Sequence, residues 1–272
     1  MSKDDIVLEV GPGLGILTLE LAKYVKKVIA VEKDKKMVEV IKNVLNDENV
    51  KNVEVIEGDI LKIQKAITAL CHPEPEAKDL TPEEAHADEI LLRQLTDQND
   101  IKYKLVANIP YYLTSTLIRK FLESNFPPQA MVLMIQKEVA QRICAQPPKM
   151  TLLATAVQFY AEPKIISYVS KKSFVPQPKV DSAIIKIVPR AIGTKSLQRD
   201  LVPEFFKIAK AGFAHPRKQL INNLSAGLKL SREKTEKIIL KTGLQPTARP
   251  SELSVDNWLD LVWNIWGKKD II

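Results

Sequence analysis

The sequence predicts an α/β protein with a doubly wound, parallel sheet followed by a small all-helical domain. Two patterns indicate this fold. From Ile6 to Val188, short apolar runs typical of buried strands alternate with segments whose apolar residues recur at helical spacing. Beyond Arg190 only helical patterns remain. We therefore expect one domain over residues 1–189 and a second, basic and helical, over residues 190–272.

Each element is predicted from its local pattern. The parallel strands are expected at Ile6 to Val10, Lys27 to Val31, Val53 to Ile56, Lys104 to Asn108 and Met131 to Ile135. Two later runs, Lys164 to Val169 and Ser182 to Val188, are expected to pair antiparallel at the sheet edge. Apolar spacing predicts helices through residues 37–45 and 113–121, and later over Val202 to Ala211, Arg217 to Leu228, Ser231 to Lys241 and Val255 to Trp266.

Composition restricts the class of protein. The chain has 272 residues, 45% of them hydrophobic, which is enough for a full core. No apolar run approaches the roughly 18 residues that span a membrane. Only two cysteines are present, Cys71 and Cys144, and neither they nor the scattered histidines show metal-ligand spacing. We expect a soluble, cytoplasmic protein that is monomeric, has no metal and does not bind a membrane.

Charge is distributed unevenly along the chain. The net charge is +7, but residues 72–100 carry nine acidic side chains against two basic ones, so the remainder is more strongly basic. The tail beyond Arg190 carries 14 basic and eight acidic residues. Such a surface favours a polyanionic partner. A solvated helical cap explains the tail equally well on composition alone.

A glycine-rich turn, Gly11-Pro12-Gly13-Leu14-Gly15, stands directly between a predicted strand and a predicted helix. Glycines there let the backbone approach a nucleotide-like ligand closely. The spacing is not the G-x-G-x-x-G of dinucleotide sites, and Glu9 just before it would repel a pyrophosphate. Because Glu9 suits a cationic amino-acid group, S-adenosyl-L-methionine fits this turn better than a dinucleotide.

Acidic residues end the next two predicted strands. Glu32 follows the second strand, where an acid commonly accepts hydrogen bonds from ribose hydroxyls. Asp59, followed by Ile60, comes after the third strand, near the expected position of the adenine amino group. Each acid taken alone is more simply interpreted as a charged surface residue. Together, at the carboxyl ends of consecutive strands beside the glycine turn, they indicate a cofactor site.

The fourth predicted strand ends in Asn108-Ile109-Pro110-Tyr111-Tyr112, the most specific element of the sequence. An adenine amino group is a poor nucleophile because its lone pair is delocalised into the ring. Hydrogen bonds from that group to the Asn108 side-chain oxygen and the Pro110 carbonyl would localise the lone pair and stabilise the developing positive charge. Tyr111 offers a ring on which an extruded adenine can stack. An ordinary turn is the alternative, since Asn and Pro favour turns.

These motifs, together with the segment from Ser173 to Ser182, resemble those of the KsgA-type small-subunit (16S) rRNA adenine dimethyltransferases over almost the whole chain. The resemblance implies a Rossmann-like class I methyltransferase sheet and transfer of methyls from S-adenosyl-L-methionine to two adjacent adenines in a 3′-end hairpin loop of 16S rRNA, during small-subunit biogenesis. It also implies that Phe174 closes on the flipped base opposite Tyr111. From chemistry alone, a core anchor is the preferred interpretation of Phe174.

Residues 212–224 are similar to the family's Phe…Arg-Lys…Leu…Asn-Leu element. Arg217 and Lys218 are predicted to stand at a helix start, where cations oppose the macrodipole, so an anionic partner explains them better than stability does. The basic surface is expected to extend through Lys137, Arg142, Lys171, Lys172 and Lys179.

Two features depart from the family pattern. The usual N-terminal segment, which covers the cofactor, is not found before the first strand, so we expect low cofactor affinity. The interval between Asp59 and Asn108 is longer than the family needs. We interpret residues 66–100 as an acidic surface insertion that points away from RNA.

Three alternative functions compete with rRNA dimethylation of the small subunit. A non-catalytic RNA-binding assembly factor would keep the fold and the basic surface. An antibiotic-resistance methyltransferase of large-subunit rRNA is disfavoured by the Tyr111-Tyr112 pair and the basic tail. A DNA adenine methyltransferase would need a separate recognition domain that the tail does not resemble.

Overall fold

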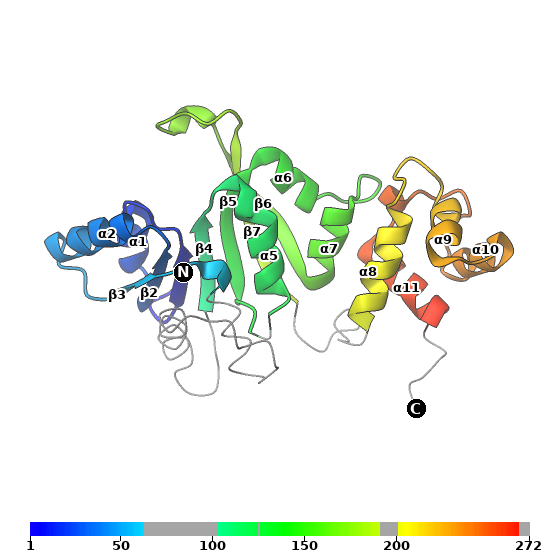
Figure 1. The fold of residues 1–272 in the computed structure, drawn as a ribbon, viewed down its shortest axis with the longest axis horizontal. Helices are drawn as coiled ribbons and strands as arrows, with labels where there is room; N and C mark the ends of the chain where they lie inside the picture. The colour runs from blue at the N-terminus through cyan, green and yellow to red at the C-terminus, as the bar shows by residue number, and fades with distance from the viewer. Residues whose placement is uncertain (63–102, 125, 191–200, 267–272) are drawn as a thin grey trace. The chain divides into compact units, whose positions relative to one another are not determined.

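The structure is a computed structural model, and it describes residues 1–62, 103–124, 126–190 and 201–266. By their contacts the residues form two compact units (Figure 1). The first comprises Met1–Lys137 and Ile166–Pro189; the second comprises Glu138–Ile165 and Arg190–Ile272. The segment expected to form the acidic insertion, residues 66–100, lies outside the described residues, as do Cys71, His72 and His86. Nothing in the structure tests how functions divide between residues 1–189 and 190–272, so that division stays a prediction.

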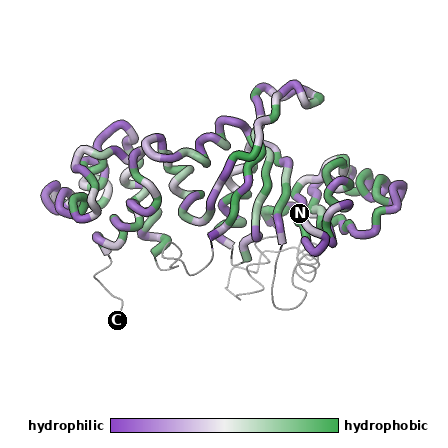
Figure 2. The backbone as a smooth tube through the Cα atoms, turned by 180° about the vertical axis from the view of Figure 1, so that it is seen from behind, coloured by the Kyte–Doolittle hydropathy of each residue, from purple (hydrophilic) through white to green (hydrophobic). Residues whose placement is uncertain are grey.

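A seven-stranded sheet has the order β3-β2-β1-β4-β5-β7-β6. Its strands are β1 (Ile6–Val10), β2 (Lys27–Glu32), β3 (Val53–Glu57), β4 (Tyr103–Asn108), β5 (Ala130–Gln136), β6 (Ala161–Val169) and β7 (Ser182–Pro189). Strands β1 to β5 pair in parallel, and β7 pairs antiparallel with β5. The α/β prediction is confirmed, with every predicted strand present and shifted by a few residues at most. Figure 2 shows hydrophobic residues concentrated along these strands.

The strand order predicts a ligand site at the carboxyl ends of β1 and β4. Strand β1 lies between β2, which follows it, and β4, which comes much later in the chain. In open α/β sheets, ligands bind beyond the carboxyl ends of the strands where the order reverses in this way. Val10 at the end of β1 is in register with Ala107 of β4, so Gly11 and Asn108 are the next residues on neighbouring strands.

Helices of the first unit cover the sheet. They are α1 (Ile16–Ala22), α2 (Lys35–Asp47) and α5 (Thr114–Leu122). Helix α2 begins where the Asp34 side chain accepts a hydrogen bond from the Lys36 N–H, and it buries Val38, Ile41 and Leu45. The 3₁₀ helices η2 (Tyr111–Leu113) and η3 (Lys171–Ser173) follow β4 and β6. The loop that carries η3 projects from the sheet between β6 and β7 (Figure 1).

The second unit has its own apolar core. Its helices are α6 (Lys137–Ile143), α7 (Leu152–Tyr160), α8 (Val202–Gly212), α9 (Leu220–Leu228), α10 (Arg232–Lys241) and α11 (Val255–Trp266); Lys137, the first residue of α6, belongs to the first unit. Phe159 of α7 stacks on Phe205 of α8 with ring centroids 4.1 Å apart. Trp258 of α11 is fully buried. The aromatic contact explains why α7 joins this unit although it precedes Arg190 in the chain.

Helix α9 differs from the prediction at its start. It begins at Leu220, not at Arg217, and its first N–H donates to the Ala248 carbonyl at 2.8 Å. Before it, the Lys218 N–H closes a turn on the His215 carbonyl at 2.9 Å. Arg217 and Lys218 therefore lie in a turn ahead of the helix, where the macrodipole argument made for them is weak.

Candidate active site

The glycine turn after β1 has the open backbone that its sequence predicts. Gly11, Gly13 and Gly15 have φ angles of 67°, 56° and 80°, in the left-handed region that favours glycine. A Cβ atom built on Gly11 or Gly13 would meet no described atom within 4 Å. At Gly15 the Cβ would come within 2.9 Å of the Ile41 side chain. The first two glycines thus border open space, whereas Gly15 allows α2 to pack closely.

Glu32 ties this turn to the end of β2. Its Oε2 accepts a hydrogen bond from the Gly13 N–H at 3.2 Å, and its Oε1 accepts from the N–H groups of Lys33 and Asp34 at 2.8 and 2.9 Å. The Gly11 N–H donates to the Val31 carbonyl at 3.0 Å. Because a carboxylate has about four lone-pair positions, Glu32 can fix the turn and still accept from a ligand hydroxyl.

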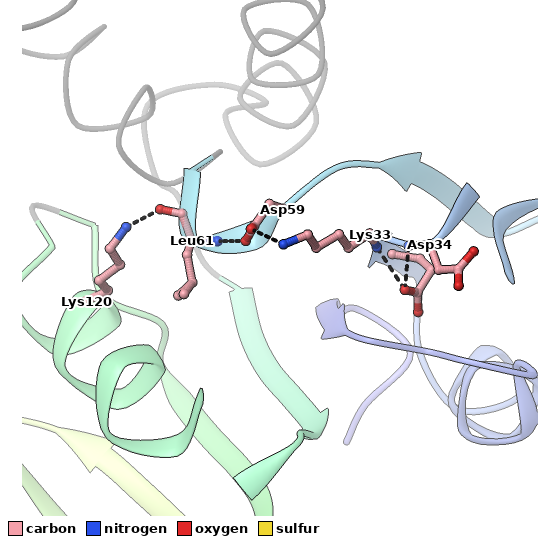
Figure 3. Close-up of polar contacts among 6 residues, drawn as sticks. Lys33, Asp34, Asp59, Leu61 and Lys120 are labelled. Atoms are coloured by element: carbon pink, nitrogen blue, oxygen red, sulfur yellow. Dashed lines mark hydrogen bonds and ion pairs between the residues drawn. The ribbon is translucent and has the colours of Figure 1, made fainter. Parts of the chain in front are cut away.

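Asp59 follows β3 and is held from two sides (Figure 3). Its Oδ1 accepts from the Leu61 N–H at 3.0 Å, and its Oδ2 accepts from the Lys33 ammonium at 3.0 Å. Partial burial by itself would raise the pKa of Asp59, but these hydrogen bonds outweigh it and hold the pKa below its usual value. The next side chain, Ile60, is buried in the core, so only its backbone can face a ligand.

Glu9 is a buried carboxyl group near the turn. Only 1% of the residue is exposed, and burial raises its pKa to about 7, while the Thr18 hydroxyl acts in the opposite direction. Within the described residues, neither Glu9 Oε2 nor Thr18 Oγ1 makes a hydrogen bond of ordinary geometry. An unpaired buried carboxyl oxygen is costly, which fits a group that is completed by a cationic ligand.

Asn108 is exposed at the end of β4, level with Gly11 across the β1–β4 pair. Pro110 is also exposed, and its carbonyl accepts the Leu113 N–H at 3.0 Å, which closes the turn into η2. A carbonyl oxygen has two lone pairs, so one remains for a substrate. The two acceptors invoked for the adenine amino group are therefore both accessible at the carboxyl edge of the sheet.

Tyr111 is fixed through its hydroxyl. Its Oη lies 3.1 Å from Oγ of Ser182, a buried residue that begins β7. Phe174 is half-buried after η3, and among the described residues the structure gives no ring contact between it and Tyr111. The position of Phe174 opposite the target base therefore stays a prediction.

The basic residues proposed to bind RNA fall in both units. Lys171, Lys172 and Lys179 lie in the projecting β6–β7 loop, and the Lys171 N–H donates to Asp181 Oδ1 at 3.1 Å. Lys137, which begins α6, pairs with Asp181 Oδ2 at 3.7 Å and lies over the Tyr168 ring. The second unit contributes exposed residues from α6 and the turn before α9, namely Arg142, Arg217 and Lys218.

Three residues of the site were missed by sequence reasoning. These residues, which contact or adjoin residues identified by the motifs, are Lys33, Thr18 and Ser182. In a sequence, a lysine or a hydroxyl residue at such a position is usually interpreted as a surface residue. Lys33 gave a signal only through its adjacency to Glu32. Ser182 ends the Ser173–Ser182 motif, but that motif does not reveal its partner, Tyr111.

The remaining titratable and membrane features are limited. Cys144 is a half-buried free thiol whose pKa is raised by burial. Among the residues that the structure describes, no cluster of His, Cys, Asp and Glu could hold a metal ion. Within the same ranges, no helix is long and apolar enough to cross a membrane.

Comparison with known proteins places this site in a family. A family profile described as "Ribosomal RNA adenine dimethylase" matches residues 1–265. The "Ribosomal RNA small subunit methyltransferase A" of Dehalococcoides mccartyi strain 195 is 39% identical over 255 residues, which cover 93% of this chain and 76% of the relative. The protein of the same name from Geobacillus kaustophilus is 34% identical, covering 96% of this chain and 81% of the relative.

Solved structures show the same architecture. A dimethyladenosine transferase from Plasmodium falciparum matches with a TM-score of 0.67 and 26% identity, covering 96% of this chain and 90% of that one. The 23S rRNA methyltransferase ErmE matches with a TM-score of 0.68 at 23% identity, covering 97% of this chain and 92% of that one, which shows a shared fold. The class I methyltransferase fold is thereby confirmed. With the family profile spanning residues 1–265, the chain belongs to the ribosomal RNA adenine dimethylase family.

Proposed function

We propose that this protein transfers methyl groups from S-adenosyl-L-methionine to the N6 atoms of two adjacent adenines in a 3′-end hairpin loop of 16S rRNA. One observation carries the proposal: Asn108, the last residue of β4, lies beside Gly11, the first residue after β1, so the catalytic motif adjoins the cofactor turn. The relatives named small-subunit rRNA methyltransferases support the choice of substrate.

The residues present fit S-adenosyl-L-methionine. Open space over Gly11 and Gly13 admits the ligand, and Glu9 offers its unpaired carboxyl oxygen to the amino group. Glu32 accepts from the ribose hydroxyls, and Asp59 accepts from the adenine amino group, with the backbone at Ile60 beside it. When bound, the cofactor supplies a methyl group on a sulfonium, which needs no metal to activate it.

Asn108 and Pro110 prepare the substrate nitrogen. The Asn108 side-chain oxygen and the Pro110 carbonyl accept the two hydrogens of the target amino group, which turns the nitrogen lone pair toward the methyl group. As nitrogen becomes positive, the same two dipoles stabilise it. The proton is then released to solvent, so no strong general base is required.

Tyr111 and Phe174 position the base. A flipped adenine stacks on the Tyr111 ring, worth roughly 1 to 3 kcal/mol per base, and the Ser182 contact holds that ring in place. Phe174 closes the opposite face. The basic residues Arg217, Lys218, Lys171, Lys172, Lys179 and Arg142 bind the RNA backbone. The protein acts as a monomer in the cytoplasm on precursor small subunits.

The deciding experiment is transfer of radiolabelled methyl groups to small ribosomal subunits that lack this modification, followed by nucleoside analysis. Dimethyladenosine in the RNA supports the proposal. Binding to the subunit without any methyl transfer, while the cofactor binds normally, would instead favour a non-catalytic assembly factor. Methyl transfer to 23S rRNA alone would assign the enzyme to the other ribosomal subunit.

A further inference from the structure

Lys33 joins the two acidic residues that are proposed to hold the adenosine moiety. Its backbone N–H donates to Glu32 Oε1 at 2.8 Å, and its ammonium donates to Asp59 Oδ2 at 3.0 Å. The side chain thus crosses from the end of β2 to the residue that follows β3 (Figure 3). The Lys33 ammonium thus binds one of the two Asp59 oxygens to which the amino group of a purine would donate.

Each carboxylate oxygen of Asp59 already accepts one hydrogen bond. Oδ1 accepts the Leu61 N–H, and Oδ2 accepts the ammonium of Lys33. The Leu61 bond is made by backbone in a turn and stays in place. The Lys33 side chain is 77% exposed, so it can move into water at little cost.

We propose that Lys33 is a positioning residue of the adenosine site, which pairs with Asp59 Oδ2 in the free protein and competes there with the adenine amino group. The inference rests on the proposed function. The ion pair competes with the cofactor, but because it is exposed its effect on affinity is limited to about fivefold.

The competition affects the choice of purine. A 6-amino group donates to Asp59 and gains when Lys33 withdraws. A 6-oxo group only accepts, so it is repelled by the Asp59 carboxylate and depends on the Lys33 ammonium as a donor. Lys33 therefore weakens discrimination between adenine and hypoxanthine ligands.

The test compares the wild-type chain with Lys33→Met, which keeps most of the apolar stem and removes the charge. Lys36→Met is the matched control, because Lys36 is exposed on α2 and its side chain has no hydrogen bond or ion pair with any described residue. Binding of S-adenosylhomocysteine and of S-inosylhomocysteine is measured by calorimetry at low and high salt.

We expect Lys33→Met to bind S-adenosylhomocysteine about two- to fivefold more tightly than wild type at low salt, and S-inosylhomocysteine no better or more weakly. The gain should shrink at about 1 M salt, where exposed charges are screened, and Lys36→Met should match wild type. If Lys33→Met binds S-adenosylhomocysteine as tightly as wild type or more weakly, the inference about Lys33 is overturned and the proposed function is not. A wild-type chain that binds neither ligand overturns the proposed function as well.

Discussion

The hydroxyl of Tyr111 lies 3.1 Å from Oγ of Ser182, and so couples the first residue of η2 to the first residue of the antiparallel strand β7. Ser182 is 1% exposed and cannot move without disturbing β7. The contact therefore restrains the orientation of a ring that is otherwise only partly buried. If Tyr111 stacks on the target base, this restraint sets the position of that base.

Tyr111→Phe and Ser182→Ala should each lower kcat roughly fivefold, on the order of 1 kcal/mol for one lost hydrogen bond, with little change in the affinity for the cofactor. The double variant should lose no more than either single variant, because both remove the same contact. Steady-state kinetics of the three variants check this, with Tyr112→Phe as a control on an exposed neighbour. Additive losses would mean that the two hydroxyls act separately.

Asn108→Ala should abolish methyl transfer, with a fall in kcat of at least about 10²-fold, since one oriented dipole at the reacting atom is removed. RNA binding should remain largely intact because the basic residues proposed to bind the RNA backbone are unchanged. Single-turnover transfer and filter binding on the same preparation separate the two effects. Equal loss of both activities would make Asn108 a structural residue.

Glu9 should make both stability and cofactor binding depend on pH. Its pKa of about 7 in the folded chain exceeds the ordinary glutamate value of 4.5, so the folded state keeps a proton that the unfolded state has lost. The contribution of Glu9 to the free energy of unfolding is therefore largest below about pH 4.5. It falls by about 3 kcal/mol in total as the pH rises through 7.

Glu9→Gln should abolish that part of the pH dependence. Urea denaturation of wild type and variant between pH 5 and pH 8 gives the difference attributable to this group. The affinity for S-adenosyl-L-methionine should rise with pH across the same range in wild type only, because the ionised carboxylate is the form that attracts the amino group. Parallel curves for the two chains would show that Glu9 does not titrate there.

Replacing Arg217 and Lys218 by Ala should weaken RNA binding. The slope of the logarithm of the binding constant against the logarithm of the salt concentration should become less steep by about 0.7 to 0.9 for each cation removed. Both are exposed in the turn before α9, so stability should change little. Binding measured across a salt series gives the slope. Removing two exposed lysines of the first unit, Lys42 and Lys51, provides the charge-matched control. An unchanged slope in the Arg217/Lys218 variant would exclude them from the interface.

The sequence by itself determined the fold class and the order of the elements. Strands with continuous apolar runs, such as Val28 to Val31 in β2, are predictable because both faces of a parallel sheet are buried. The positions of the glycine turn, Glu32, Asp59 and Asn108 were also predictable, since each lies at the end of a strand or just after it. Periodicity is local, so it locates elements well and their partners poorly.

Only the tertiary structure decided which side chains meet. The contacts between Tyr111 and Ser182 and between Lys33 and Asp59 join residues far apart in the chain. Helix α7 was not predicted, and its place in the second unit depends on stacking of Phe159 on Phe205. The start of α9 at Leu220 depends on the Ala248 carbonyl, a distant acceptor that caps its first N–H. Such contacts are set by packing in three dimensions, which local sequence patterns do not encode.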